Sequence, residues 1–127
     1  MSDGSLDPAD WSDLRALGHR MVDDMIDSLE SVRDRPVWQR MPDALRAELH
    51  AAGLPHEPQD PAAAYDDFRR LVLPYPTGNL HPRFMGWVHG GGTPVGMLAE
   101  MLAAGLNANL GGRDHIPIEV EIGRAHV

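Results

Sequence analysis

The 127-residue sequence contains neither lysine nor cysteine, and its eleven basic residues are all arginines. Without cysteine, disulfide bonds and thiolate nucleophiles are excluded. Without lysine, no side-chain amine can form a Schiff base with a carbonyl compound. A composition rich in arginine, alanine, glycine and proline explains why surface positions lack lysine. It does not supply a side chain that could act as a catalytic amine.

The chain also lacks positive charge and long apolar runs. Its net charge is -8 and its pI is about 5.2, so it has no basic surface for nucleic acid, and we expect no nucleic-acid partner. Residues 93–112 are nearly uncharged but are interrupted by Glu100 and two asparagines, which favours a buried helix over a membrane span. Residues 1–10 are polar and acidic, unlike a signal peptide. We therefore expect a cytoplasmic protein without a membrane partner.

After the polar leader at residues 1–10, residues 11–73 read as an amphipathic helical segment. Asp7-Pro8 has the pattern of a helix start, and Pro36 predicts where the first helix ends. Between these two signals, apolar residues recur at steps of three and four, which predicts one apolar face on the helix. Its members are Trp11, Leu14, Leu17, Met21, Val22, Met25, Ile26, Leu29 and Val32.

Two shorter helices are predicted after a connector at residues 38–41. The first covers residues 42–52, with Gly53 as its C-cap. The second opens at Asp60-Pro61, again a cap followed by proline, and runs to about Val72. The residues expected to face inward are Leu45, Leu49, Tyr65, Phe68 and Leu71. Residues 73–81 contain two prolines and a glycine and are predicted to be irregular.

The region 74–121 combines a loop with a strongly apolar helix. Thr93-Pro94 predicts the start of a helix that extends to about Leu110, and the pattern Ile116–Glu119 predicts the start of another. The helix at residues 95–110 has no polar face, so a partner chain or further sequence must cover it. Expressed alone, the chain is therefore expected to fold poorly or aggregate.

The last six residues, 122–127, continue no pattern. Codons for Ile-Gly-Arg-Ala-His-Val match a common sequencing-library adapter, so we interpret these residues as a non-native tail that replaces the true sequence near Glu121. A genuine short polar tail is the alternative. Reading the genomic sequence across this junction distinguishes the two.

Candidate binding motifs gather between residues 81 and 93. The glycines at 90–92 precede a helix start and could cradle an anion, but a flexible approach to the Thr93 cap is the favoured interpretation. His81 and His89 flank an apolar stretch and are candidates for a ligand-facing or a structural role. The seven histidines show no zinc-binding spacing, so we expect no metal site.

The block Leu80-His81-Pro82-Arg83-Phe84-Met85-Gly86-Trp87-Val88-His89-Gly90-Gly91-Gly92-Thr93-Pro94 resembles the pyridoxal-phosphate-dependent group II amino-acid decarboxylases. The segments Phe68–Pro74, Met97–Leu102, Asn107–Asn109 and Glu119–Glu121 fit the same family, aromatic-L-amino-acid decarboxylase being its best-known member. The resemblance extends over residues 11–121 and is closest to bacterial members.

The resemblance implies that the chain is the N-terminal helical segment of a fold type I enzyme whose parent protein is α/β. This parent is expected to be a cytoplasmic homodimer that binds pyridoxal 5'-phosphate and decarboxylates an L-amino acid. The Schiff-base lysine lies downstream in such enzymes, so the chain alone is expected to be inactive and to bind no cofactor covalently. It is expected to supply dimer contacts and part of the substrate pocket.

By the same resemblance, the substrate-binding residues are Trp87, Val88, His89, Gly90, Asn109, Leu110 and Gly111. At 109–112 the chain has an asparagine and two glycines where the animal enzymes hold an aromatic side chain with aromatic and aliphatic groups, which argues against an aromatic substrate. Two alternatives to the decarboxylase stay open. One is an aminotransferase of the same fold, and the other is a non-enzymatic all-helical module that dimerises through residues 95–110.

Overall fold

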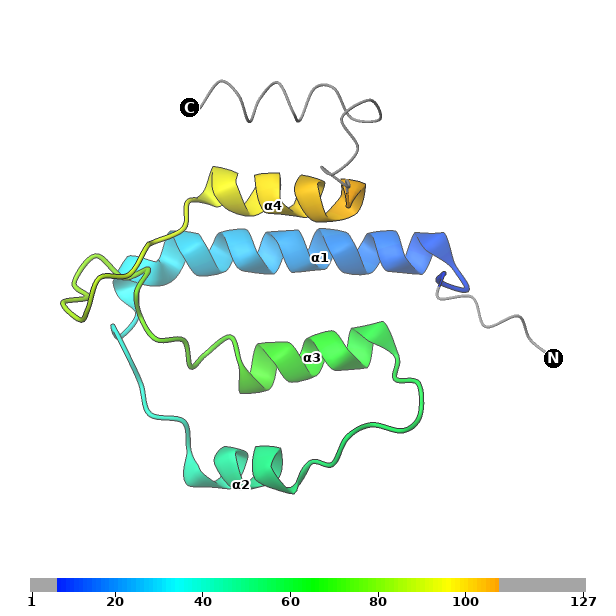
Figure 1. Ribbon diagram of the computed structural model, residues 1–127, viewed down its shortest axis with the longest axis horizontal. Coiled ribbons are helices and arrows are strands. Elements are labelled where there is room, and N and C mark those ends of the chain that lie inside the picture. The colour runs from blue at the N-terminus through cyan, green and yellow to red at the C-terminus, as the bar shows by residue number, and fades with distance from the viewer. Residues whose placement is uncertain (1–6, 108–127) are drawn as a thin grey trace. The chain divides into compact units, whose positions relative to one another are not determined.

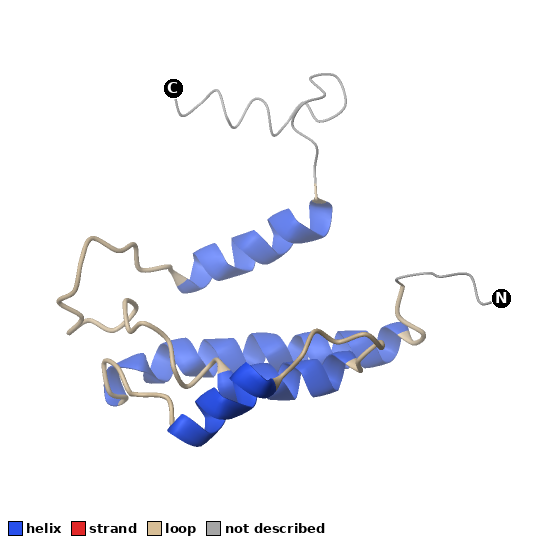
Figure 2. Cartoon of the chain, turned by 60° about the horizontal axis from the view of Figure 1, so that its bottom comes forward, coloured by secondary structure: helices blue, strands red, loops and turns tan. Residues whose placement is uncertain are grey.

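The computed structural model describes residues 7–107, and these contain α-helices, a short 3-10 helix and no strand (Figure 1, Figure 2). The mainly α class predicted for the chain is confirmed for this part of it. The chain divides into two compact units, one ending at Gly91 and the other beginning at Gly92, and each unit is described by itself.

Helix α1 (Trp11–Glu30) starts later than the sequence pattern predicts. Its N-cap is Asp10, whose Oδ1 accepts hydrogen bonds from Ser12 N at 2.7 Å and Ser12 Oγ at 2.6 Å. These bonds from Ser12 lower the pKa of Asp10. The predicted start at Asp7-Pro8 is therefore wrong, because the carboxylate that satisfies the free N-terminal amides is that of Asp10.

The end of α1 follows the prediction made from Pro36. A 3-10 turn, η1 (Ser31–Asp34), tightens the last residues, and Arg35 then adopts an extended conformation with φ -96° and ψ 162°. A residue before proline is disfavoured in the helical region by a clash with the proline ring. The connector from residue 36 to residue 41 is irregular, as expected.

Helices α2 (Asp43–Ala51) and α3 (Pro61–Leu71) lie within one residue of their predicted limits. The α3 cap is confirmed, since Asp60 Oδ1 accepts a hydrogen bond from Ala62 N at 3.1 Å. The predicted C-cap at Gly53 is wrong. Ala52 occupies that position in an extended conformation, so the chain leaves α2 without needing a left-handed residue.

The predicted inward-facing residues of α2 and α3 are only partly buried. Tyr65 and Leu71 are buried, Leu45 is half-buried, and Leu49 and Phe68 are exposed. The expectation for Leu49 and Phe68 is therefore corrected. Helix α2 is linked to α3 by an exposed ion pair, Arg70 with Glu48, and this link does not cover Leu49.

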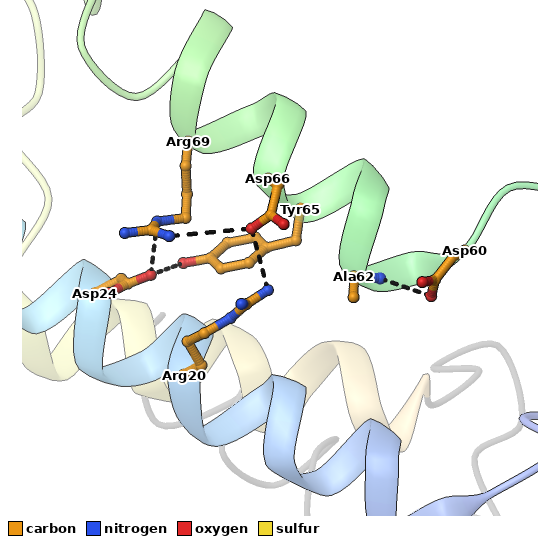
Figure 3. Close-up of polar contacts among 7 residues, drawn as sticks. All are labelled: Arg20, Asp24, Asp60, Ala62, Tyr65, Asp66 and Arg69. Atoms are coloured by element: carbon orange, nitrogen blue, oxygen red, sulfur yellow. Dashed lines mark hydrogen bonds and ion pairs between the residues drawn. The ribbon is translucent and has the colours of Figure 1, made fainter.

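Helices α1 and α3 are joined by a polar cluster built around one buried phenol (Figure 3). The hydroxyl of Tyr65 donates to Asp24 Oδ2 at 2.8 Å, and Arg69 Nε lies 3.0 Å from the same oxygen. Arg20 stacks over the Tyr65 ring at 5.1 Å and pairs with Asp66 at 3.3 Å. Because the cluster links side chains from both helices, it fixes α3 against α1.

A second polar link ties α2 to α3. The guanidinium of Arg70 contacts both oxygens of Glu48, with Nη2 to Oε1 at 2.6 Å and Nη1 to Oε2 at 2.8 Å, and also reaches Asp67 at 2.9 Å. The hydrogen bond from Arg70 lowers the pKa of Glu48. Both partners are about half exposed, so solvent screens the pair and its contribution to stability is small.

The apolar core of the described residues is thin. Its buried hydrophobic side chains are Leu17, Tyr65 and Leu71, and no side chain there is completely buried. On the predicted apolar face of α1, Trp11, Leu14 and Ile26 are exposed. The side-chain contacts between the helices of the first unit are therefore largely polar.

Helix α4 (Pro94–Leu106) begins where predicted and ends earlier. Thr93 Oγ1 accepts a hydrogen bond from Gly96 N at 3.0 Å, which confirms the cap. The predicted end at about Leu110 is wrong because Asn107 takes the left-handed conformation, with φ 42°, and stops the helix. Asparagine tolerates that conformation better than other residues with a Cβ. The helix start predicted at residues 116–119 lies outside the described residues.

No side chain of α4 is buried, although the helix is made almost entirely of apolar and small residues. Its exposed large hydrophobic residues are Val95, Leu98, Met101, Leu102 and Leu106. Within residues 7–107, none of the helices has the length and apolar character needed to cross a membrane.

The buried phenol predicts an alkaline limit to stability. Burial, followed by the hydrogen bond to Asp24, raises the pKa of Tyr65 above its ordinary value of 10.0. A raised folded-state pKa contributes stability that is complete below pH 10.0 and is lost as the pH rises through that pKa. We expect the free energy of unfolding, measured by denaturant titration, to decline in that alkaline range.

The matched control is Tyr65→Phe, which keeps the ring and removes the hydroxyl. We expect it to lower the free energy of unfolding at neutral pH by about 1 kcal/mol, through the lost hydrogen bond to Asp24. It should also remove the part of the alkaline decline that belongs to Tyr65. An unchanged alkaline decline in the variant would contradict the assignment.

The exposed apolar surface of α4 predicts self-association of the isolated chain. We expect light scattering to show oligomers or aggregates, and the double substitution of Leu102 and Leu106 by glutamate to shift the chain toward monomer. Leu54→Glu, which changes an exposed leucine of a loop, is the control and should leave the association unchanged. A monomeric wild-type chain with a cooperative unfolding transition would contradict this prediction.

Candidate functional site

The loop predicted to bind substrate lies at residues 84–90, at the end of the first unit. Its most unusual residue is Trp87, which has a φ of 31° although it is not glycine. Such a conformation is costly for a large side chain and persists only where the surroundings hold it, which is common in binding loops. Trp87 is 83% exposed and Val88 is fully exposed.

An aromatic group forms the face of this loop. The indole of Trp87 stacks on the ring of His89 with centroids 5.6 Å apart and planes at 29°, and the ring of Phe84 lies tilted against His89 at 6.1 Å. Offset or tilted ring pairs at these separations are favourable. The loop therefore presents connected ring surfaces that can receive an apolar or aromatic ligand group.

A pocket of about 350 Å³ lies against the same loop. Trp87, Gly86 and Phe84 form one side of it, and Trp38 and Val37 belong to the connector after η1. Thr77 completes the lining. Two indoles and a phenyl ring thus line an open pocket that could receive a flat apolar group.

Trp38 was not predicted as a site residue, because its sequence pattern assigned it only to a connector. The signal was a tryptophan in a polar loop close to a proline. That Trp87, 49 positions later, lines the same pocket is not visible in any local pattern. Among the predicted substrate-binding residues, Trp87 lines this pocket, whereas Val88, His89 and Gly90 do not. Asn109, Leu110 and Gly111 lie outside the described residues, so their predicted role stays a prediction.

Gly78 holds the connector close to the loop that precedes the site. It has a φ of +85°, and a Cβ added there would overlap the carbonyl oxygen of Val37. Nearby, Gln39 Nε2 donates to Pro74 O at 2.7 Å. Only glycine allows this backbone approach, so Gly78 sets the distance between the two sides of the pocket.

His81 supports the loop from beneath. It is 4% exposed, its Nδ1 accepts a hydrogen bond from Arg83 N at 3.0 Å, and its carbonyl oxygen accepts one from Phe84 N at 2.9 Å. Asn79 Nδ2 adds a bond of 3.0 Å to Gly90 O. Of the two candidate histidines, His81 is therefore buried in the scaffold, and His89 is exposed on the aromatic face.

The triple glycine is exposed and leads directly into the Thr93 cap of α4. Both explanations of Gly90–Gly92, the flexible approach to the cap and the anion cradle, are compatible with this arrangement and stay predictions. Within residues 7–107, no group of three or more histidine, aspartate or glutamate side chains is placed to hold a metal ion.

The sequence is similar to several enzymes of known activity, although no family model matches it. It is 39% identical over 77% of its length to a tyrosine decarboxylase of Oryza sativa subsp. japonica. It is 33% identical over 84% of its length to a phenylacetaldehyde synthase of Arabidopsis thaliana. A bacterial relative, an aromatic-L-amino-acid decarboxylase of Bacillus atrophaeus, is 32% identical over 75% of the chain.

The chain belongs to the group II amino-acid decarboxylase family. The resemblance noted from the His81–Pro94 block is confirmed, including the presence of a bacterial member among the relatives. The chain spans about a fifth of the length of these relatives, 19% to 22% of each.

Members of the group II decarboxylase family generally depend on pyridoxal 5'-phosphate, and this chain on its own does not fit that cofactor. It has no lysine to anchor the cofactor's aldehyde carbon. It presents the ring-lined pocket around Trp38 and Trp87, whose lining contains no cationic side chain that could hold a phosphate.

The close approach at Gly78 predicts that the pocket depends on this residue. Gly78→Ala should lower the free energy of unfolding by about 3 kcal/mol, because the added methyl group meets backbone and the positive φ is strained. Denaturant titration measures this loss. Gly53→Ala, where an added Cβ has nothing within 4 Å, is the control and should be close to neutral. Equal effects of both substitutions would contradict the assigned role.

Proposed function

We propose that this chain is the helical, pocket-lining part of a longer pyridoxal-phosphate-dependent carboxy-lyase that acts on an L-amino acid. The observation that carries the proposal is the pocket between Trp38 and Trp87, on a loop whose sequence places the chain in the decarboxylase family. Its relatives are named as decarboxylases of tyrosine and of aromatic L-amino acids.

Within the longer enzyme we assign to this chain the binding of the substrate side chain. The rings of Trp38, Phe84 and Trp87 exclude water from an apolar group and orient it by stacking. The strained backbone at Trp87 holds its indole in place before the substrate arrives, which reduces the ordering cost of binding. Val88, His89, Gly90, Asn109, Leu110 and Gly111 are proposed to extend this surface.

The cofactor, when bound, supplies the electron-withdrawing ring that lets the bond to the substrate carboxylate break. The lysine that would hold it must come from sequence outside these 127 residues. We propose a fold type I, α/β parent and a homodimer, to which the apolar surface of α4 contributes contacts. The cytoplasmic location expected from the sequence stays a prediction.

Two observations bear on the choice of amino acid in opposite directions. The rings of the pocket and the names of the relatives favour an aromatic side chain. The sequence at 109–112 argues against one. We propose an aromatic L-amino acid, because the side chains of Trp38, Phe84 and Trp87 line the pocket.

The first test is the genomic sequence beyond the codon for Glu121. The proposal expects an open frame that continues for several hundred residues and supplies the missing lysine, with residues 122–127 absent from it. A frame that ends at Val127 in genomic DNA would overturn the enzyme and leave the non-enzymatic helical module.

The second test is product analysis of the complete enzyme with aromatic, aliphatic and acidic L-amino acids. Release of carbon dioxide with formation of the amine supports a decarboxylase, whereas a keto acid with retained carboxylate supports the aminotransferase. Trp87→Ala should reduce kcat/KM for the preferred substrate by about tenfold or more, because a stacking surface is lost. Trp11→Ala, at an exposed indole of α1, is the matched control and should change kcat/KM little.

A further inference from the structure

The loop that carries Trp87 is held by one hydrogen bond at each end. At its start, Phe84 N donates to His81 O at 2.9 Å. At its end, Asn79 Nδ2 donates to Gly90 O at 3.0 Å. Within residues 7–107, residues 85–92 take part in no further hydrogen bond. The bond from Asn79 is therefore the described polar contact that fixes the end of the loop next to the glycines.

The backbone after the loop supplies little stiffness of its own. Gly90, Gly91 and Gly92 do not have a φ in the left-handed range, and a Cβ added to Gly90 or Gly92 would meet nothing within 4 Å. Residues with a side chain can adopt the same conformation, so the described backbone does not require glycine at these positions. Glycine there widens the range of conformations open to the chain. Three in a row leave the end of the loop free to move unless a contact holds it.

The Asn79 side of this contact is firmly placed. Gly78 and His81, on either side of it in the sequence, are buried, and His81 N donates to Gly78 O at 2.9 Å. Thr77 Oγ1 donates to Asn79 Oδ1 at 2.7 Å, which turns the amide nitrogen toward Gly90 O. Asn79 also lines a larger cavity of about 650 Å³, whose other walls are α1, the connector after η1 and the end of α3. Because a cavity rather than packed side chains adjoins it, its two hydrogen bonds set the direction of its amide.

The strained backbone of Trp87 lies between the two anchors of the loop. Its φ of 31° persists only where the surroundings hold it. The indole is largely exposed, so burial does not hold it. The ring that it stacks on belongs to His89 of the same loop, and this contact cannot place the loop against the rest of the chain. The bonds at Phe84 and Gly90 are the described contacts that can.

We propose that Asn79 is a positioning residue, which holds the Trp87 indole at the pocket by tethering Gly90. Asn79 does not line that pocket, so it acts through the loop and not on the substrate. The assignment rests on the proposed function, because it takes the pocket as the place of the substrate side chain. Without the tether, the glycines let the end of the loop move and Trp87 relaxes its φ. The indole then leaves the place where an aromatic ring would stack on it.

The test uses the complete protein, translated from the full reading frame and labelled with fluorotryptophan. The fluorine resonances of Trp87 and Trp11 are identified by their loss in Trp87→Phe and Trp11→Phe. Asn79→Asp keeps the shape of the side chain and the bond from Thr77, but it puts an acceptor where Gly90 O needs a donor. We expect this variant to shift and sharpen the Trp87 resonance. An unchanged Trp11 resonance shows that α1 keeps its structure.

The kinetic test separates binding from chemistry. With an aromatic L-amino acid as substrate, Asn79→Asp should raise KM about fivefold, which corresponds to the net contribution of one hydrogen bond. It should change kcat little, because stacking on the indole is shared by the bound substrate and the transition state. Gln59→Glu makes the same change from amide to acid in the exposed loop before α3. This control should alter neither the Trp87 resonance nor KM.

Stiffening the glycine tract tests why the tether is needed. Replacing Gly91 and Gly92 by alanine in the Asn79→Asp protein should recover part of the resonance shift and part of the loss in KM, because fewer conformations remain open to the end of the loop. General damage to the fold would not be recovered in this way. The same two alanines in the wild-type protein should change little, since their Cβ atoms would meet only Asn79 O, at 3.8 Å from that of residue 91.

An unmoved Trp87 resonance in Asn79→Asp overturns the assignment, whether or not KM rises, because Asn79 then does not act through Trp87. Absence of any recovery by the two alanines overturns it as well. If the complete protein decarboxylates no amino acid but the Trp87 resonance still moves, the proposed function fails and the positioning role stands. If it decarboxylates an aromatic L-amino acid and Asn79→Asp changes neither the resonance nor KM, the positioning role fails and the proposed function stands.

Discussion

The hydrogen bond from the Tyr65 hydroxyl to Asp24 is the contact on which the first unit depends. A phenol and a carboxylate are both costly to remove from water, and they offset that cost only by bonding to each other and to Arg69. The pair fixes α3 against α1, and the end of α3 leads directly into the loop that carries Gly78 and His81. The position of the pocket therefore depends on a polar contact rather than on a large hydrophobic core.

That arrangement suits a chain whose cations are all arginines. A guanidinium can bridge two carboxylates at once, as Arg69 does with Asp24 and Asp66. It can also donate to both oxygens of one carboxylate, as Arg70 does with Glu48. These contacts set the directions of the helices, although exposed pairs add little free energy. With Leu17, Tyr65 and Leu71 as its buried apolar side chains, the described part of the chain leaves much hydrophobic surface to be covered from outside it.

Sequence patterns predicted the features that depend on neighbouring residues. Asp60-Pro61 and Thr93-Pro94 start helices because a cap and a fixed φ act within one turn, and Pro36 ends one for a similarly local reason. The errors come from local competition, since Asp10 caps α1 in place of Asp7 and Asn107 ends α4 before Leu110. Trp38 was missed because its role depends on the return of a distant loop past Gly78.

Val37 and Trp38 line both the smaller pocket and the larger cavity, so the two volumes share a wall. A side chain at position 38 that grows or turns toward one space takes room from the other. A substitution that reshapes the smaller pocket without touching the larger cavity would have to fall at Thr77, Phe84, Gly86 or Trp87, which line the pocket alone.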